Sequence, residues 1–312
     1  MTDPLVPDES HGASRRLTLA QRLDAYERLI RLDKPIGTLL LLWPTLTALW
    51  LAARGSPSLV LVLVFTLGTL VMRSAGCAFN DFADRSFDAH VKRTAQRPLA
   101  IGEIAPWEAV VVGCVLSLMA FALVALATNR TTILLAVAAF AITLAYPLCK
   151  RFLAVPQAFL GIAFSFGIPM AFAAVLGYVS PFGWWLFAFN LFWVIAHDTE
   201  YAMVDRDDDL RIGIRASAIT FGRFDVMAVA ICYAIFLAGV AWLAWRVPLG
   251  WLFWVGFAAA VFLAFYHLWL IRGRECERCF HAFLNNHWLG FAIFAGVAAD
   301  FAWRLRAWPR LS

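Results

Sequence analysis

Apolar residues occur along this chain in long blocks, and shorter segments between the blocks carry most of the charge. Blocks of about 20 apolar residues match the ~30 Å hydrocarbon core of a bilayer. They do not alternate apolar and polar positions, which argues against a membrane β-barrel. The pattern predicts an all-α polytopic membrane protein, a bundle of about nine transmembrane helices. The expected spans are residues 36–53, 57–79, 106–128, 131–148, 153–175, 181–197, 224–245, 248–271 and 283–303.

The two ends of the chain depart from this pattern. We expect a disordered tail at residues 1–17, a single transmembrane domain at residues 18–304 and a second tail at residues 305–312. Residues 18–35 form an amphipathic pattern, with Leu19, Leu23, Tyr26 and Ile30 on one side. Two interpretations stay open for this segment: a helix on an anionic membrane surface, or a solvated helix that leads into the first span.

Composition and charge agree with a membrane protein. Of the 312 residues 62% are hydrophobic and only 15% charged, whereas a soluble protein of this length would carry more charge. The net charge of +5 is modest, and its basic residues gather in particular loops, so we infer no nucleic-acid partner. Nothing in the sequence indicates a protein partner.

The basic residues predict the orientation in the membrane. The N-terminal segment and residues 80–105, 149–152, 198–223 and 272–282 are rich in Lys or Arg, whereas the opposite loops carry only Arg54, Arg130 and Arg246. The positive-inside rule places the N-terminus and the basic loops on the cytoplasmic side.

Two acidic motifs lie in these basic loops. Asn80, Asp84 and Asp88 are four residues apart, so on a helix they share one face. A constant offset of 121 residues superposes Asp84 and Asp88 on Asp205 and Asp209, which indicates a weak internal repeat. Either motif alone is typical of solvated loop charge. Their shared spacing, neighbouring arginines and common predicted side favour one binding site.

The residue types in the motifs suit Mg²⁺ and a diphosphate. Carboxylate and amide oxygens are ligands for Mg²⁺, which also keeps waters and binds substrate phosphates. An EF-hand is excluded because Leu210 stands where the loop needs Gly and Ala216 where it needs Glu. The pair Cys276 and Cys279 has no second CxxC beside it, which disfavours a zinc site but leaves metal binding by these two residues open.

Basic residues around the motifs offer contacts for phosphate oxygens, although positive-inside anchoring explains most of them. Lys150 and Arg151 are the strongest candidates because they follow a span directly in a very short loop. Arg73 lies within the second expected span, where an unpaired guanidinium is costly, so we expect it to face the interior and pair with a carboxylate. The remaining basic candidates are Arg85, Lys92, Arg93, Arg97, Arg206, Arg211 and Arg215.

A diphosphate site that opens into an apolar helix bundle points to a lipid diphosphate as substrate. Metal ions and arginines would stabilise the departing diphosphate and leave an allylic carbocation. A dry, aromatic interior would shield this cation from water until an acceptor attacks it. The hypothesis is prenyl transfer with release of diphosphate.

The chain resembles the UbiA superfamily of intramembrane prenyltransferases, whose motifs NxxxDxxxD and DxxxD correspond to Asn80, Asp84, Asp88 and to Asp205, Asp209. Within that superfamily it is similar to the 4-hydroxybenzoate polyprenyltransferases of ubiquinone biosynthesis. The similarity covers most of residues 28–295. Its matching stretches are RLDKPIG with LLLLWPT, AGCAFNDFADRSFDAHVKRT, YPLCKR, FGIPMAFAA and DTEYAMVDRDDDLRIGIRASA.

The resemblance implies a nine-helix bundle in the bacterial inner membrane, with its active site open to the cytoplasm. The substrates would be a polyprenyl diphosphate and 4-hydroxybenzoate, which is alkylated ortho to its hydroxyl. Asn80 and the four catalytic aspartates Asp84, Asp88, Asp205 and Asp209 would bind Mg²⁺, and Asn80, Lys150, Arg151 and Arg206 would contact the diphosphate. Arg31, Lys34 and Arg73 are candidates to hold the carboxylate of the acceptor.

Two other functions stay open at this point. The same chemistry on homogentisate, a naphthoate, haem or a chlorophyllide would use the same motifs. A cation-coupled transporter also carries carboxylates within the membrane. The transporter would place them near the midplane, however, whereas here they lie at span ends among arginines.

Overall fold

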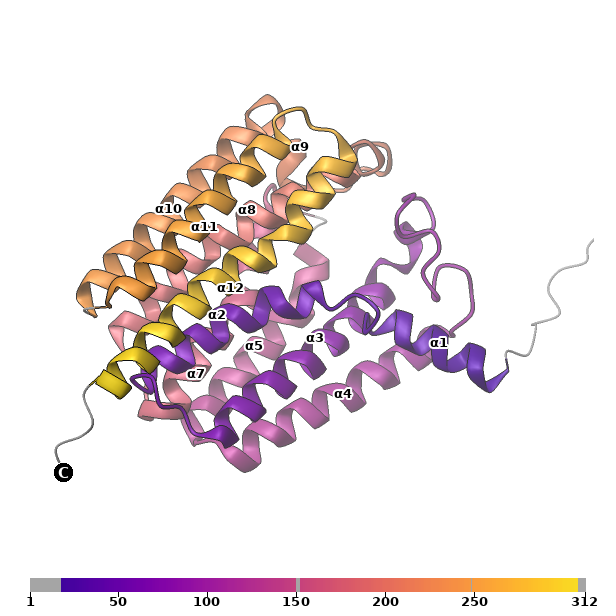
Figure 1. Cartoon of the computed structure of the whole chain (residues 1–312). Coiled ribbons are helices and arrows are strands. Elements are labelled where there is room, and N and C mark those ends of the chain that lie inside the picture. Colours follow the sequence, from indigo (N-terminus) through magenta and orange to yellow (C-terminus); the bar gives the residue numbers. More distant parts are fainter. Residues whose placement is uncertain (1–17, 150–151, 248, 308–312) are drawn as a thin grey trace, which may run out of the picture.

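The computed structural model describes residues 18–149, 152–247 and 249–307, and within these ranges it contains helices and no strand (Figure 1). The expected tail at residues 1–17 lies outside them, as do residues 308–312. The helices are α1 (Leu19–Leu29), α2 (Ile36–Ala52), α3 (Leu59–Asp88), α4 (Pro106–Ala127), α5 (Arg130–Cys149), α6 (Pro156–Ser165), α7 (Gly167–Leu176), α8 (Pro181–Ile212), α9 (Ser217–Phe221), the 3₁₀ helix η1 (Gly222–Phe224), α10 (Asp225–Arg246), α11 (Trp251–Ile271) and α12 (Cys276–Ala307).

Seven helical segments of the described chain are long and apolar enough to cross a membrane. They contain α3, α4, α5, the pair α6 and α7, the run from α9 to α10, α11 and α12. Helix α2 is apolar but has 17 residues, and α8 is apolar in its first half and charged in its second. The chain is therefore a multi-pass helical membrane protein, and α2 and α8 occupy the two remaining segments that the sequence marks as spans.

Helices α3 and α8 extend well beyond the spans expected for them. They have 30 and 32 residues, which at 1.5 Å per residue makes each about 45 Å long, longer than the ~30 Å hydrocarbon core. Ser180 caps the start of α8, where its hydroxyl accepts a hydrogen bond from the N–H of Gly183, and Gly213 ends it in the left-handed conformation. Each acidic motif thus lies on the extended end of a long helix.

The single span expected at residues 153–175 consists of two helices. Helix α6 ends at Ser165 and α7 begins at Gly167. Pro169 has no N–H to bond the carbonyl of Ser165, which favours a break at this point. Gly167 lies so close to α2 that an added Cβ would approach the hydroxyl of Thr45. At this break, the buried Asn190 of α8 donates a hydrogen bond of 2.8 Å to the side-chain hydroxyl of Ser165.

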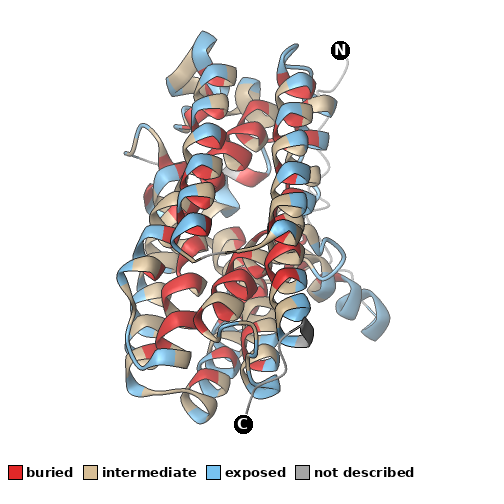
Figure 2. Cartoon of the chain, turned by 60° about the vertical axis from the view of Figure 1, so that its left-hand side comes forward, coloured by how far each residue is buried: buried red, intermediate tan, exposed pale blue. Residues whose placement is uncertain are grey.

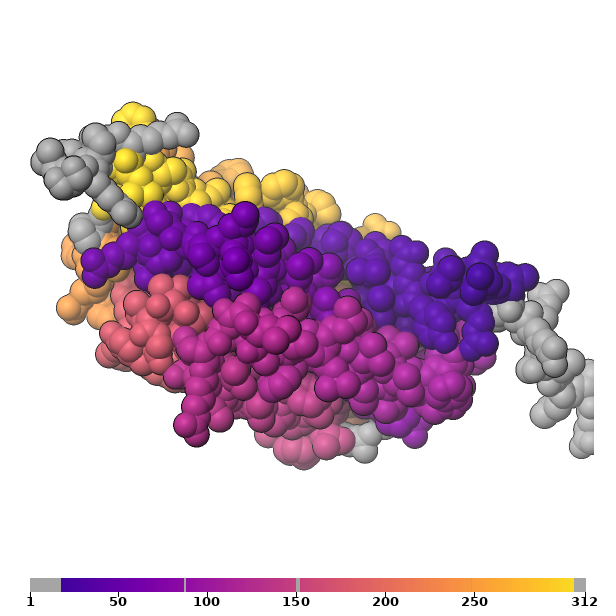
Figure 3. Space-filling model, turned by 90° about the horizontal axis from the view of Figure 1, so that it is seen from below, coloured from indigo at the N-terminus to yellow at the C-terminus, as the bar shows by residue number. Residues whose placement is uncertain are grey.

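Buried residues line the inside of the bundle, and exposed apolar residues cover its outside (Figure 2). One cluster joins α8, α10, α11 and α12, and a second joins α2, α3, α7 and α8. From below, the N-terminal half covers most of the visible face and α12 follows one edge (Figure 3). Helix α8 contributes to both clusters and so connects the two parts of the bundle.

Helix α1 packs across the ends of α3 and α4. Ala25 and Leu29 are fully buried, whereas Leu19 and Leu23 are 76% and 60% exposed. The side chains of Arg22 and Tyr26 contact the carboxylate of Glu108 on α4. Neither interpretation of residues 18–35 predicted this contact with a carboxylate of the protein itself.

Helices α11 and α12 cross at two glycines. A Cβ added at Gly256 would lie 2.5 Å from the carbonyl oxygen of Ala292 and 2.9 Å from the Cα of Gly296. Neither atom can move away alone, because both belong to the α12 backbone. The close approach of these helices therefore depends on the absence of a side chain at Gly256.

We predict that Gly256→Ala lowers the free energy of unfolding by about 1–3 kcal/mol, because the added methyl group forces α11 and α12 apart. Gly68→Ala is the matched control. No atom lies within 4 Å of a Cβ there, and alanine favours a helix over glycine by about 0.5–1 kcal/mol. Thermal unfolding in detergent, followed by circular dichroism, measures both variants. Equal melting temperatures for the two would contradict the close packing.

Candidate active site

A cavity of about 1210 Å³ lies between the two parts of the bundle, with walls from α2 to α8 and from the start of α12. Its charged end contains both acidic motifs. Its remaining walls are largely apolar and include Phe65, Met72, Phe121, Val124, Phe140 and Phe166. A substrate with a charged head and a hydrocarbon tail matches this division.

The first motif lies on the cavity side of α3. Asn80, Asp84 and Asp88 all line the cavity, as their spacing of four residues predicts. The amide of Asn80 donates a hydrogen bond of 3.1 Å to the carboxylate of Asp84. Asp88 lies 2.8 Å from a guanidinium nitrogen of Arg97. Burial raises the pKa of Asp88 above its usual value, although the nearby Arg97 opposes this shift.

The second motif lies on α8, on the opposite wall. Asp205 and Asp209 line the same cavity as the first motif. Arg93 binds Asp205 through two nitrogens, with distances of 2.6 to 3.1 Å, and its guanidinium lies 4.4 Å from the ring centre of Tyr201. Arg93 and Arg97 both belong to the segment that follows α3. This segment thus links the carboxylates of the two helices through its arginines.

The oxygen donors are suitable for a hard divalent cation that arrives with phosphate. Within the described residues, no three His, Cys, Asp or Glu side chains are close enough together to hold a metal ion by themselves. The carboxylates are instead divided between two walls, with arginines between them. Such a donor set fits Mg²⁺, which takes few protein ligands and completes its shell with water and phosphate oxygens.

The three candidates for the acceptor carboxylate have different surroundings. Arg31 already binds both carboxylate oxygens of Asp81, at 3.0 and 2.9 Å, and Asp81 is only 1% exposed. The Lys34 side chain is 74% exposed and lies 3.9 Å from Asp33. Arg73 lines the cavity from the middle of α3. The positive charge is therefore already paired in Arg31, exposed to solvent in Lys34 and located at the cavity wall in Arg73.

Arg73 has no carboxylate partner among the described residues, so the expected ion pair is wrong. Its side chain packs over Gly37, where an added Cβ would lie 2.7 Å from the guanidinium, and contacts the sulfur of Cys77. Its buried Nε atom has no hydrogen-bond partner within the described part of the chain. Gly37 lies beside Arg73 because of the position of α2 in the fold. Residue spacing along the chain does not predict such a contact.

The candidates for contacts with the diphosphate also differ in whether they line the cavity. Arg206 does not line the cavity, because its guanidinium lies 3.4 Å from the buried carboxylate of Asp225, which Arg274 also binds. Lys150 and Arg151 lie outside the described residues. Arg93 and Arg97, which the sequence offers only among many basic residues, line the charged end of the cavity.

Sequence reasoning missed two carboxylates of the site. Asp198 on α8 lines the cavity, and Asp81 on α3 binds both Arg31 and Arg97. Asp198 precedes Asp205 by seven residues, two helical turns, which puts both on one face. That spacing was a usable signal. No comparable signal marks Asp81, because its role depends on distant arginines.

Comparison with known proteins identifies relatives over most of the chain. A model of the UbiA prenyltransferase family matches residues 41–292. The 4-hydroxybenzoate octaprenyltransferase of Cupriavidus necator is 59% identical over 286 residues, 92% of this chain and 100% of the relative. The protein of the same name from Burkholderia vietnamiensis is 58% identical over 280 residues, 90% of this chain and 96% of the relative.

Solved structures share the fold. A UbiA homologue from Aeropyrum pernix aligns with a TM-score of 0.73 and 26% identity, over 85% of this chain and 98% of that one. A UbiA homologue from Archaeoglobus fulgidus, solved with GPP and Mg²⁺, aligns with a TM-score of 0.66 and 18% identity, over 89% of this chain and 99% of that one. The chain belongs to the UbiA prenyltransferase family.

Proposed function

We propose that this protein transfers a polyprenyl group from a polyprenyl diphosphate to 4-hydroxybenzoate, ortho to the hydroxyl, in ubiquinone biosynthesis. Relatives that are 58–59% identical over at least nine-tenths of the chain are 4-hydroxybenzoate octaprenyltransferases. The observation that carries the proposal is one cavity, lined at its charged end by both acidic motifs and elsewhere by apolar side chains.

Mg²⁺ is the metal that the donor set favours. Asn80, Asp84, Asp88, Asp205 and Asp209 would hold it together with the diphosphate, because amide and carboxylate oxygens from both walls face the charged end. When bound, the metal neutralises negative charge on the diphosphate as it departs.

Several basic residues at the charged end of the cavity would bind the diphosphate together. Arg93 and Arg97 lie beside the motifs, and each presents several N–H groups that can bind phosphate oxygens. Lys150 and Arg151 remain candidates from the sequence. Arg206 is not part of this proposal, because it binds Asp225 away from the cavity.

Arg73 is the best partner for the carboxylate of 4-hydroxybenzoate. Arg31 is already bound to both carboxylate oxygens of Asp81, and Lys34 is exposed. Arg73, by contrast, lines the cavity and has no carboxylate partner among the described residues. A buried cation is strongly disfavoured unless a counter-charge approaches it. An anionic acceptor supplies that charge and is held within the apolar part of the site.

The apolar walls would protect the reacting allylic cation. Aromatic faces stabilise positive charge, and exclusion of water prevents its hydrolysis. Tyr201 and Phe140 both line the cavity, at its charged and apolar parts respectively. The bond between the prenyl carbon and the diphosphate oxygen breaks first, and the diphosphate leaves with the electron pair. The acceptor ring then forms the new carbon–carbon bond to the allylic cation and releases its ring proton to a base.

We further propose nine membrane crossings in a bacterial inner membrane, with the N-terminus and both motifs on the cytoplasmic side. Helices α2 and α8 supply the two crossings beyond the seven segments of sufficient length and apolarity. The basic segments at both motifs support this orientation, since Lys and Arg are enriched in cytoplasmic loops.

Purified protein should form 3-prenylated 4-hydroxybenzoate with Mg²⁺ and lose this activity in EDTA. Asp84→Asn and Asp205→Asn should each lower kcat by about 100-fold or more, because each removes a negative ligand from the metal–diphosphate site. Product is measured by chromatography, and the exposed Asp24→Asn serves as the control. Full activity in either motif variant would rule out a two-motif site.

Arg73→Gln should raise the KM for 4-hydroxybenzoate by about 10–100-fold, since a charged hydrogen bond is worth about 1.5–3 kcal/mol. The methyl ester of 4-hydroxybenzoate, which lacks the negative charge, should be used equally poorly by both proteins. Arg54→Gln, at an exposed arginine between α2 and α3, is the control. If Arg73→Gln still preferred the acid over the ester as strongly as the wild type does, a residue other than Arg73 would hold the carboxylate.

The orientation can be tested with native thiols. Cys276 is exposed at the start of α12, on the expected cytoplasmic side. A membrane-impermeant maleimide should label it in inside-out vesicles but not in right-side-out vesicles. Ser56→Cys in a Cys276→Ser background should show the opposite pattern, because Ser56 lies in the loop between α2 and α3. Labelling of both positions from the same side would disprove the topology.

A further inference from the structure

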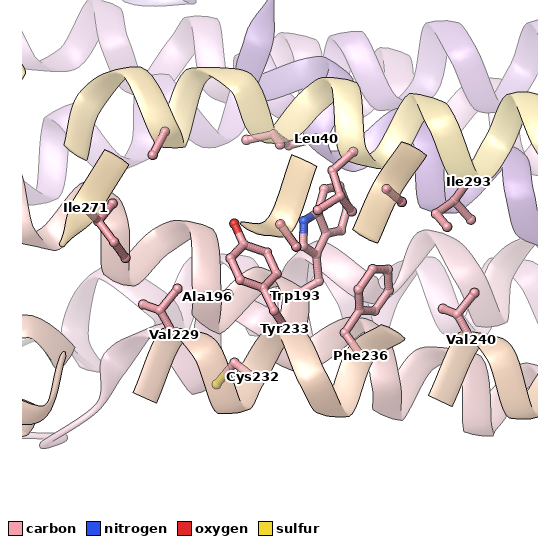
Figure 4. Packing of buried hydrophobic residues seen from close by; sticks show 14 of the residues in the cluster. Leu40, Trp193, Ala196, Val229, Cys232, Tyr233, Phe236, Val240, Ile271 and Ile293 are labelled. Carbon is pink, nitrogen blue, oxygen red and sulfur yellow. The ribbon is translucent and has the colours of Figure 1, made fainter. Parts of the chain in front are cut away.

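A cluster of polar side chains is buried behind α8, on the side away from the cavity. It consists of Trp193 and Glu200 on α8, Tyr233 on α10, His267 on α11 and Asn286 on α12, and none of them is more than 1% exposed. Figure 4 shows Tyr233 and Trp193 close together among the apolar residues of this region. None of the five residues lines the cavity, so the proposed reaction does not account for them.

The amide of Asn286 has a fixed orientation. Its Oδ1 atom lies 2.9 Å from the indole nitrogen of Trp193, and its Nδ2 atom lies 3.0 Å from the carbonyl oxygen of Ala282. An indole N–H can only donate and a carbonyl oxygen can only accept, so both contacts require this orientation. Nδ2 also donates a hydrogen bond of 2.7 Å to Oε2 of Glu200.

The hydroxyl of Tyr233 has one proton and three neighbours. Its oxygen lies 2.9 Å from Oδ1 of Asn286, 2.8 Å from Oε1 of Glu200 and 3.1 Å from Nδ1 of His267. Oδ1 of Asn286 carries no hydrogen, so Tyr233 must donate its proton there. The contact with Glu200 then needs a proton on Oε1, and His267 must donate from Nδ1. Every hydrogen bond is satisfied only when Glu200 is protonated.

The charge balance supports the same assignment. No Lys or Arg among the described residues forms an ion pair with Glu200, although its side chain is fully buried. The other titratable groups around the cluster are Tyr233, Cys232, Cys279, His197, His267 and His281, none of which is a permanent cation. An ionised carboxylate in such surroundings is far more costly than a neutral acid.

We propose that Glu200 is a neutral carboxylic acid near neutral pH, and that the network it completes fixes the rotation of α8 about its axis. Trp193 and Glu200 are seven residues apart and therefore share one face of α8. Asp198, Asp205 and Asp209 occupy the other face and line the cavity. Hydrogen bonds on the first face to α10 and α12 thus hold the second acidic motif toward the first. Glu200 is a positioning residue that does not touch substrate.

Infrared spectroscopy of the full-length protein in lipid tests the protonation state directly. The difference spectrum between wild type and Glu200→Gln, recorded near neutral pH, should contain the carbonyl stretch of a protonated carboxyl group, which shifts in D₂O. Glu277→Gln, at an exposed carboxylate of α12, should show only the loss of carboxylate bands. Absence of the protonated carboxyl band would overturn the proposal. This readout needs no substrate and stands apart from the proposed function.

Variants test the positioning role. Glu200→Gln preserves one donor and one acceptor, so prenyl transfer should stay within about threefold of wild type. Tyr233→Phe removes the hydroxyl that joins three side chains and should lower turnover about tenfold or more, because buried polar atoms lose their partners. It should also shift the carboxyl band, since the acid loses its acceptor. A tenfold loss in Glu200→Gln, or an unshifted band in Tyr233→Phe, would contradict the assigned network.

Discussion

Neutralisation of carboxylate charge at the end of the cavity is the constraint on which the rest of this structure depends. Helices α3 and α8 bring acidic motifs to opposite walls, and like charges this close to an apolar interior repel one another. The segment after α3 supplies Arg97 for Asp88 and Arg93 for Asp205. These ion pairs allow both motifs to face one space. The same positive groups are also suitable for a diphosphate.

Much of the fold could be predicted from the sequence, because span length and hydropathy determine where membrane helices lie. The expected span at residues 106–128 corresponds to α4 at Pro106–Ala127, and that at residues 224–245 corresponds to α10 at Asp225–Arg246. The spacing of four residues also placed Asn80, Asp84 and Asp88 on one face. These properties are local, since a helix repeats every 3.6 residues whatever surrounds it.

The remaining features depend on contacts between distant segments. Charge and position made Arg206 a diphosphate candidate, but the buried Asp225 binds it elsewhere. Arg73 was expected to pair with a carboxylate and instead packs over Gly37. Nothing in the sequence distinguishes Asp81 from the other acidic residues of α3, and its contacts with Arg31 and Arg97 form only in the fold. Sequence identifies which residues carry charge, whereas partner choice requires the three-dimensional arrangement.

Helix α8 shows why a membrane enzyme of this kind needs two types of polar face. The face toward the cavity carries acidic side chains, which lie close to arginines there and would share the proposed metal. The opposite face meets three helices in the bundle, and no arginine among the described residues pairs with Glu200 there. Leucine at Glu200 would pack in such a position but would make no directional contact with α10 or α12. A network of hydrogen bonds between neutral side chains also allows this face of α8 to be buried, but it favours one rotation of the helix about its axis. That rotation determines the direction in which the second motif points.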